Sequence, residues 1–403
     1  MITVAEARTL IFRDAAPGPI ETTSLLRGLG KVLAEPVLAP SCLPPFDHAA
    51  VEGVAVRSGD LTAAEPGMPV RLSTMPPSAN GPGAVVELAP GSVCRVAAGA
   101  PLPLGADAVV RAEAFRGEGG RAVFSHPVEP GENVRRSGAD LREGDRVLEA
   151  GTVLTPACVA LLAGCGVMDV KVHAAPRVAI LTVSDERVPP GHLLGSAQPY
   201  DSSAFALAAM VSEAGGIPLL LGGLWNDREH TLLQLREAAT HDVILISGGR
   251  AGTGLESFGD LLERHGELHV DRVAHQPGMP FTYATLWEKP VFTLPAHPDS
   301  SLLCFEVYVR PLLRMILGQR ELERPRLWVT MAEAFAKPPG KEAFFRVILD
   351  RTTEGTIAHL TESAESQLPT GLARPSALVF LPADVAGLAA GERVEALSLA
   401  SLN

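Results

Sequence analysis

Apolar residues near the N-terminus recur every three or four positions, which places them on one face of a helix. The first set is Val4, Ala7, Leu10 and Ile11, and the second is Leu25, Leu26, Leu29 and Val32. The pattern predicts two amphipathic helices in this part of the chain.

The pattern changes between about residues 44 and 135, where short β-like runs are separated by turn residues. Examples of the runs are Ala84–Leu88 and Cys94–Ala97, and Pro101-Leu102-Pro103 is one of the breaks. This texture predicts a β-rich domain. The chain leaves it near Gly138-Ala139-Asp140, and Pro156–Gly164 then reads as a helix with Thr155 as its N-cap.

From Arg177 onward, short apolar runs alternate with longer amphipathic segments. The expected strands are Val178–Val183, Pro218–Leu221, Val243–Ile246 and Val291–Leu294. The expected helices are Ser202–Ala214 with Asp201 as its cap, Asp227–Ala239, Glu256–His265 and Ser300–Ile316. This alternation predicts a parallel, doubly wound α/β sheet, which binds ligands at the carboxyl ends of its strands.

The remaining chain, from about Leu322, is strand-like again. The expected strands are Phe344–Leu349, Ile357–Leu360, Ala377–Leu381 and Val394–Leu397. They predict a small all-β C-terminal domain.

Composition narrows the class of protein. A chain of 403 residues is long enough for two to four domains. The formal net charge of −12 opposes non-specific binding to nucleic acid, and no apolar run approaches the ~20 residues of a membrane span. The N-terminus lacks the features of a signal or transit peptide, so we expect a soluble, cytoplasmic protein. Five scattered cysteines without a CxxC pair indicate buried thiols rather than a disulfide framework or a zinc site.

Several loops follow the expected strands and carry candidate chemistry. Ser184-Asp185-Glu186 offers two carboxylates for magnesium or a substrate amine, and the alternative is an acidic solvated loop. Ser247-Gly248-Gly249 allows backbone N–H groups to approach a phosphate, and the alternative is a tight strand-to-helix turn. Pro295-Ala296-His297-Pro298 follows a third strand, and His275–Pro280 precedes it. The fold therefore predicts that four loops meet at one edge of the sheet.

Other chemical signals are weaker. His265 and His269 have the i, i+4 spacing of metal ligands, but Gly266 interrupts the helix, so an ordinary histidine pair is the better interpretation. Arg135-Arg136 reads as solvated surface, with phosphate contact as the alternative. The sequence has no GxSxG, HExxH, Walker A or GxGxxG motif.

A whole series of motifs resembles one family. The segment Leu25–Arg57 is similar to the MoeA signature that ends in "PxFDNSAMDGYAVR", with Asp47, Gly53, Ala55 and Arg57 matching directly. Further similarities follow in the same order at residues 95–103 ("RIMTGAPVP"), 133–140 ("NIRRRGED"), 182–186 ("STGDE"), 200–203 ("YDTN"), 247–249 ("SGGVSVGDYD"), 275–280 ("IKPGKP") and 295–298 ("PGNP"). The chain resembles the MoeA family, whose relatives include the E domain of gephyrin, along nearly its full length.

The resemblance implies a multidomain fold: an N-terminal helical and linker domain at 1–44 and 139–175, an inserted β-rich domain at 45–138, a central MogA-like α/β domain at 176–320 and a C-terminal β-barrel at 321–403. It also implies a homodimer that inserts molybdate into adenylylated molybdopterin and releases AMP, with magnesium as the cofactor. The enzyme that adenylylates molybdopterin is an expected partner, whereas nucleic acid and membranes are not.

The resemblance also assigns residues to roles. The implied catalytic residues are Asp47, Glu52, Asp140 and Glu186. The implied ligand-binding residues are Ser247, Gly248, Gly249, Arg250, Gln276, Pro277, Gly278, Met279, Pro295 and Pro298. Magnesium would be held by Asp185, Glu186, Asp201 and Glu256.

The chain departs from the family pattern at several of these positions. Gln276 and Met279 stand where the family has two lysines, and one lost contact between charges is worth on the order of 4 kcal/mol at an effective dielectric near 20. Other departures are Glu52, Ala98, Ser184 and Ala296-His297. Arg250, His275 and His297 are candidates to replace the missing cations.

Two alternatives to the family reaction therefore stay open. One is a catalytically impaired relative that serves as a dimeric scaffold or binding protein. The other is a cleft that accepts a different nucleotide or pterin.

Overall fold

The computed structural model describes residues 1–75, 86–183, 188–196, 198–224, 227–248, 262, 264–277, 280–338, 340–353, 355–361 and 376–399. The chain forms two compact units, one of residues 22–170 and one of residues 1–21 together with 171–403. The four-domain division given above is finer than these two units and stays a prediction. Strands β1 (Ile20–Ser24) and β12 (Asp169–His173) lie where the chain passes between the units.

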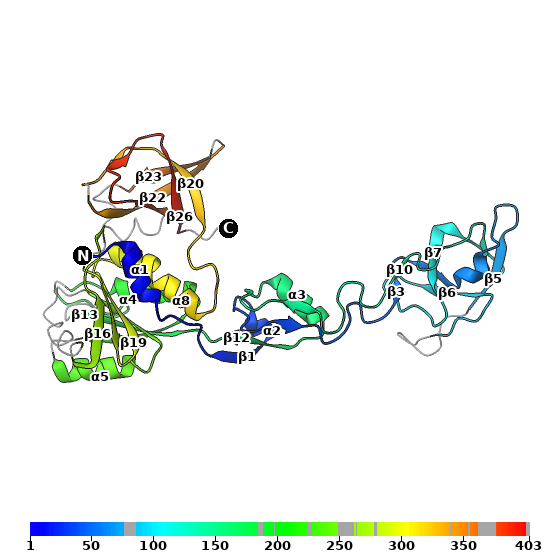
Figure 1. The fold of residues 1–403 in the computed structure, drawn as a ribbon, viewed down its shortest axis with the longest axis horizontal. Coiled ribbons are helices and arrows are strands. Elements are labelled where there is room, and N and C mark those ends of the chain that lie inside the picture. Colours follow the sequence, from blue (N-terminus) through cyan, green and yellow to red (C-terminus); the bar gives the residue numbers. More distant parts are fainter. Residues whose placement is uncertain are drawn as a thin grey trace. The chain divides into compact units, whose positions relative to one another are not determined.

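The unit of residues 22–170 contains the β-rich domain that the sequence predicts. Its six strands pair in the order β7-β4-β6-β5-β9-β8. Figure 1 labels β5, β6 and β7 of this sheet. Their bounds are β4 Gly53–Val56, β5 Val70–Thr74, β6 Ser92–Val96, β7 Ala108–Arg111, β8 Arg116–Glu118 and β9 Arg121–Phe124. No residue with a side chain fits at Gly53, because a Cβ atom would lie 2.0 Å from the carbonyl oxygen of Val110 on the neighbouring strand.

Short elements complete this unit. They are α2 Leu25–Gly28, β2 Val37–Leu38, β3 His48–Ala49, η1 Ser58–Leu61, η2 Ala112–Ala114, β10 Val134–Arg135, β11 Arg146–Leu148 and α3 Pro156–Gly164. Helix α3 begins as predicted, with Thr155 accepting a hydrogen bond from Cys158 N and Pro156 in the first turn.

The second predicted N-terminal helix is wrong in extent, because α2 makes a single turn. Gly30 adopts φ +79°, a left-handed conformation that ends helices. Val32 instead forms an isolated β-bridge with Val153. The prediction rested on the spacing of apolar residues, which does not take the helix-ending conformation of Gly30 into account.

The α/β sheet has the order β14-β13-β15-β19-β18-β16. Its strands are β13 Arg177–Val183, β14 Ile217–Leu224, β15 Val243–Ser247, β16 Gly266–Val270, β18 Thr282–Leu286 and β19 Lys289–Leu294. The first four strands of this order are parallel, which confirms the predicted parallel, doubly wound sheet. The sheet is extended by β18, which runs antiparallel to both β19 and β16. Trp287 and Glu288 join β18 to β19 in a two-residue turn with φ values of 47° and 65°, which suits a tight hairpin.

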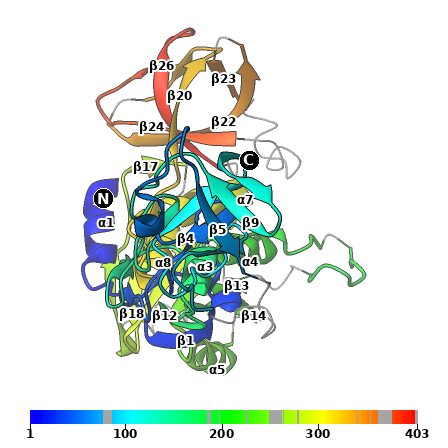
Figure 2. The ribbon, with the colours of Figure 1, turned by 90° about the vertical axis from the view of Figure 1, so that its right-hand side faces the viewer.

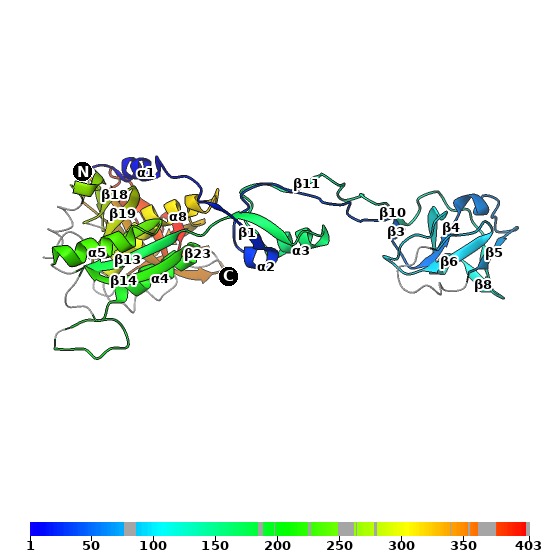
Figure 3. The same ribbon diagram turned by 90° about the horizontal axis from the view of Figure 1, so that it is seen from below.

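Helices cover both faces of this sheet (Figures 1 and 3). On one face, α1 (Val4–Phe12), α4 (Ser202–Glu213) and the helical segment 298–316 share a core with Val178, Ile180 and Val243. On the other face, α5 (Arg228–Ala238) packs against Ala179, Leu181 and Ile244. The alternation of the two core sets along each strand is the doubly wound arrangement that the sequence predicts. The predicted helix 256–265 lies almost wholly outside the described residues.

The predicted helix 300–316 is not one regular helix. It consists of α7 (Pro298–Cys304), a π-helical turn (Phe305–Val309) and α8 (Arg310–Ile316). Pro311 has no N–H, so it cannot donate to the carbonyl of Val307, four residues earlier. Arg8 from α1 donates to that carbonyl instead, at 3.4 Å.

The C-terminal domain is a closed β-barrel, seen in Figure 2. Its strands are β20 Arg326–Met331, β22 Glu342–Thr352, β23 Gly355–Leu360, β24 Ser376–Leu381 and β26 Arg393–Ser398. They pair in the order β22-β23-β20-β26-β24, and β24 closes the ring by pairing with β22. Strand β20 is additional to those predicted. The short strand β17 (His275–Gln276) pairs with β22 of the ring, whereas β21 (Phe335–Ala336) and β25 (Gly387–Leu388) pair with each other in a separate sheet.

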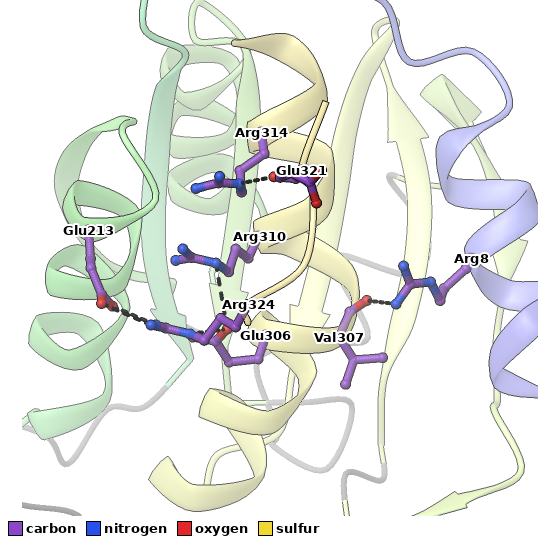
Figure 4. A network of polar contacts seen from close by, with 8 residues as sticks. All are labelled: Arg8, Glu213, Glu306, Val307, Arg310, Arg314, Glu321 and Arg324. Atoms are coloured by element: carbon purple, nitrogen blue, oxygen red, sulfur yellow. Dashed lines mark hydrogen bonds and ion pairs between the residues drawn. The ribbon is translucent and has the colours of Figure 1, made fainter. Parts of the chain in front are cut away.

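The segment that joins α8 to the barrel is fixed by charged side chains (Figure 4). Arg324 donates two hydrogen bonds to Glu306 in the π-helical turn, both at 2.8 Å, and two to Glu213 in α4, at 3.0 and 2.6 Å. The Glu306 side chain is only 6% exposed. Burial alone would lower the pKa of Arg324, but the hydrogen bonds with both carboxylates raise it above its ordinary value. Arg324 therefore stays charged and ties the barrel linker to two elements of the α/β domain.

None of the helices among the described residues is long and apolar enough to cross a membrane. All five cysteines are free thiols, and Cys165 and Cys304 are buried.

Candidate functional site at the carboxyl edge of the α/β sheet

Three parallel strands end side by side at one edge of the sheet. Thr182 of β13 is level with Ser247 of β15, and Ser247 is level with Leu294 of β19. The chain therefore leaves β13, β15 and β19 at the same edge of the sheet, as the sequence predicts for strands of this topology.

The backbone bends at Gly248 directly after β15. Gly248 adopts φ +130°, and a Cβ atom there would lie 2.8 Å from the carbonyl oxygen of Val183. Its N–H donates to the carbonyl of Leu294 at 3.1 Å. The glycine thus allows a close approach of β15 to its neighbours, but its own N–H is used within the sheet.

The N-terminus of α4 lies against the loop that follows β19. Asp201 is 8% exposed and caps α4 by accepting a hydrogen bond from Ala204 N at 3.2 Å. Ser203 donates from its hydroxyl to the carbonyl of Ala296 at 3.2 Å. The N-terminus of α4, which Asp201 caps, and the 295–298 loop are thus brought together.

The loop after β19 leads into α7 and contacts a charged residue of the barrel. Pro295 is buried and Pro298 opens α7, whereas Ala296 and His297 are exposed. Asp299 follows, with its Oδ1 atom 3.3 Å from Nε of Arg346 on β22. Burial raises the pKa of Asp299, while the positive charge of Arg346 opposes the rise.

The loop before β18 is also held by strand β22. Residues His275 and Gln276 form β17, parallel to Glu342 and Ala343 of the barrel. His275 is 2% exposed, and its Nδ1 donates to the carbonyl of Pro277 at 2.8 Å. Burial lowers the pKa of His275, so its ring is neutral near pH 7. His275 therefore does not replace a missing lysine as a cation, contrary to one of the hypotheses above.

The implied catalytic residues Asp47, Glu52 and Asp140 belong to the other compact unit. Asp47 accepts hydrogen bonds from Arg136 Nη1 and from Ser137 N, both at 2.7 Å. The bond from Ser137 N is the main reason that the pKa of Asp47 is lowered, and Arg136 adds to it. Glu52 and Asp140 are exposed.

Seven of the implied site residues lie outside the described part of the chain. They are Asp185, Glu186, Gly249, Arg250, Glu256, Gly278 and Met279. Their assigned roles stay predictions. The two histidines with metal-ligand spacing in the sequence, His265 and His269, have other contacts. His269 shares a hydrogen bond with Thr285 at 3.1 Å, and His265 packs against Trp287.

Arg346 is the residue at this edge that sequence reasoning missed. Its side chain is only 6% exposed, and it stands in an otherwise apolar strand, between Phe345 and Val347. A charged residue inside a buried strand is expensive unless it is paired, so this interruption was a usable signal. Its partner, 47 positions away from it in the chain, was not visible without the fold.

Comparison with known proteins covers the chain in three segments. Residues 2–166 match the MoeA N-terminal region (domains I and II), residues 179–315 match a probable molybdopterin-binding domain, and residues 329–399 match the MoeA C-terminal region (domain IV). The order of the three segments is the order of the domains described above.

Full-length relatives agree with this match. Molybdopterin molybdenumtransferase 2 of Mycobacterium tuberculosis H37Rv is 34% identical over 94% of this chain and 95% of its own. The molybdopterin molybdenumtransferase of Haemophilus influenzae is 29% identical over 98% of each chain. The crystal structure of a MoeA protein of molybdopterin biosynthesis from Pyrococcus horikosii is 30% identical, covers 100% of both chains and superposes with a TM-score of 0.87. With its strand ends, its closed barrel and these full-length relatives, the chain belongs to the MoeA family of molybdopterin molybdenumtransferases, which act in molybdenum cofactor biosynthesis.

Proposed function

We propose that this chain inserts molybdate into adenylylated molybdopterin and releases AMP, and that the ligand binds at the carboxyl edge of the α/β sheet. One observation carries the proposal. The ends of β15 and β19, the N-terminus of α4 and the 295–298 loop converge at this edge through contacts between Gly248 and Leu294 and between Ser203 and Ala296. Open α/β sheets bind ligands at such edges.

The residues at this edge suit a bulky anionic ligand in a specific way. Gly248 has no side chain and Pro298 has a short one, so these positions favour the close approach of a flat pterin and its phosphates. Gln276, at the end of β17, is joined to Pro277 by a cis peptide bond, and β17 pairs with the barrel strand β22 that also contacts Asp299. We assign ligand contact to Gly248, Gln276, Pro277 and the prolines at 295 and 298, and to Ser247, Gly249, Arg250, Gly278 and Met279 through the family resemblance.

Magnesium is part of the proposal. Carboxylate oxygens are the protein ligands that magnesium prefers, and Asp185, Glu186, Asp201 and Glu256 would hold it. Asp201 is the described member of this set, and its carboxylate is buried at the α4 N-terminus, beside the loop it would serve. The ion would neutralise phosphate charge when bound.

Two further parts rest on the family resemblance. Asp47, Glu52, Asp140 and Glu186 would act on the bound substrates in a cleft completed by a second copy of the chain. The adenylylated substrate would come from the enzyme that transfers AMP to molybdopterin, which makes that enzyme a natural partner.

The scaffold alternative has one specific observation in its favour. Gln276 is uncharged and the neighbouring His275 is neutral because it is buried, so this loop supplies fewer cations than the family pattern. A protein that has lost the reaction would retain the fold but neither release AMP nor bind the nucleotide.

The test is a reaction of the purified chain with adenylylated molybdopterin, magnesium and molybdate. We expect AMP release in step with molybdenum incorporation, and complementation of a strain that lacks this transferase. Asp140→Asn should lower the rate on the order of 100-fold if Asp140 takes part in proton transfer. The matched control Glu143→Gln changes a nearby exposed carboxylate and should leave the rate unchanged.

A folded wild-type chain that releases no AMP and does not complement would refute the proposal. If the chain also fails to bind adenylylated molybdopterin, the result would exclude a cleft that binds this ligand without reacting with it.

A further inference from the structure

One barrel strand, β22, contacts β17, which begins the 275–280 loop, and the first turn of α7, which follows the 295–298 loop. Near its start, β22 pairs in parallel with β17, and Glu342 N donates to the carbonyl of Ala274 at 3.0 Å. Further along the same strand, Arg346 reaches Asp299 in the first turn of α7. The loop at 275–277 is thus held by main-chain contacts, and the loop at 295–298 through a charged side-chain pair.

The 295–298 loop is also contacted from helix α4. Ser203 holds it from the α4 side, through the carbonyl of Ala296. His297 is the N-cap of α7 but makes no capping hydrogen bond with its side chain. Asp299 lies in the first turn of α7, where a carboxylate is also favoured by the helix dipole.

The Asp299–Arg346 ion pair is largely buried, so forming it requires both charges to leave water. The Arg346 side chain is 6% exposed and that of Asp299 is 23% exposed. A pair at this depth gives little net stability, because removing both charges from water costs about as much as their attraction returns. Its documented use elsewhere is to fix one arrangement out of several.

We infer that Asp299 is a positioning residue: through its ion pair with Arg346 it fixes the 295–298 loop and the first turn of α7 against barrel strand β22, in the geometry that the ligand requires. The inference rests on the proposed function for its effect on catalysis, but not for its effect on the loop. The inference also gives the barrel a role in the site, because the barrel supplies Arg346, the partner that fixes the position of the loop.

The experiment compares Asp299→Asn, which keeps the shape and removes the charge, with Asp299→Glu and Arg346→Lys, which keep the charges. Asp350→Asn is the matched control, because Asp350 is an exposed carboxylate on the same strand β22. Hydrogen exchange of the free protein, followed by mass spectrometry on peptides that cover 291–304, reports the loop. Steady-state kinetics with adenylylated molybdopterin report the ligand geometry.

For Asp299→Asn we expect faster exchange in residues 296–302, an increase in KM on the order of tenfold, and little change in kcat. Asp299→Glu should recover part of the KM, because it restores the charge opposite Arg346. Asp350→Asn should match the wild type in both measurements. Circular dichroism establishes that each variant is folded. If Asp299→Asn is not, Arg346→Gln removes the same ion pair from the other side and should give the same faster exchange and raised KM, whereas Arg346→Lys should stay closer to the wild type.

Three results would overturn the inference: unchanged exchange in 296–302, faster exchange with an unchanged KM, or an equal effect in Asp350→Asn. If the wild type itself releases no AMP, the proposed function fails, and the exchange measurement alone still decides whether the pair positions the loop.

Discussion

Two ion-paired clusters, one in each compact unit, are built from the same kinds of side chain but differ sharply in burial. In the larger unit, Arg324 joins Glu213 and Glu306, and the side chains of Arg324 and Glu306 are 9% and 6% exposed. In the unit of residues 22–170, Arg136 pairs with Asp47, and their side chains are 55% and 34% exposed. The bond lengths are similar, at 2.6–2.8 Å for these ion pairs.

The difference shows that distance alone does not tell what a charged pair does. The charges of an exposed pair are also solvated by water, so the pair contributes only about 0–1 kcal/mol to the free energy of unfolding. Breaking a buried pair leaves a charge with neither water nor a partner around it. The Arg324 cluster therefore serves the architecture. We expect that Asp47 can be changed without unfolding the protein, because its ion pair is exposed. This suits a residue with a proposed role in the reaction.

The largest expected effect follows from Arg324→Gln. The change leaves the buried carboxylate of Glu306 without its main partner, and its other cation, Arg310, is 3.8 Å away. We therefore expect a loss of about 3 kcal/mol in the free energy of unfolding. All three tryptophans of the chain, Trp225, Trp287 and Trp328, lie within residues 171–403. Urea unfolding followed by tryptophan fluorescence therefore measures this unit separately.

The matched control is Arg136→Gln in the other unit, followed by circular dichroism and limited proteolysis. We expect a change within about 1 kcal/mol, since the pair with Asp47 is exposed. Equal losses in the two variants would show that burial does not separate the clusters.

A smaller effect is expected from His275 as the pH is lowered. Burial lowers the pKa of His275 in the folded state, so the unfolded chain takes up a proton first, near its ordinary pKa of about 6.5. Stability supplied by the neutral ring is thus complete above that pH and is lost as the pH falls toward the folded pKa. The melting temperature of the wild type should drop more between pH 7.5 and 5.5 than that of His275→Gln. Parallel curves would contradict the prediction.

Much of the fold was predictable because it depends on local patterns. The strands 178–183 and 243–246 are continuous apolar runs, and the helices after Asp201, Asp227 and Thr155 begin at capping residues. These signals are written in neighbouring residues, so they survive without tertiary information.

The errors arose where distant contacts or special backbone conformations decide. The hairpin at Trp287 and Glu288 has no Asn-Gly or Asp-Gly signal, which concealed the antiparallel strands β16 and β18. The pair of Asp299 with Arg346 depends on how the barrel packs. The neutrality of His275 depends on burial, which a histidine in a loop-like sequence does not reveal.

The central claim is that the carboxyl edge of the α/β sheet binds the adenylylated pterin. The most direct measurement is hydrogen exchange of the protein with and without adenylylated molybdopterin, at a ligand concentration about 100 times the Kd. The account predicts slower exchange, by up to about 100-fold, in peptides that cover 243–250, 275–280 and 295–302, and unchanged exchange in barrel strand β26. Protection elsewhere with none at these three segments would contradict it.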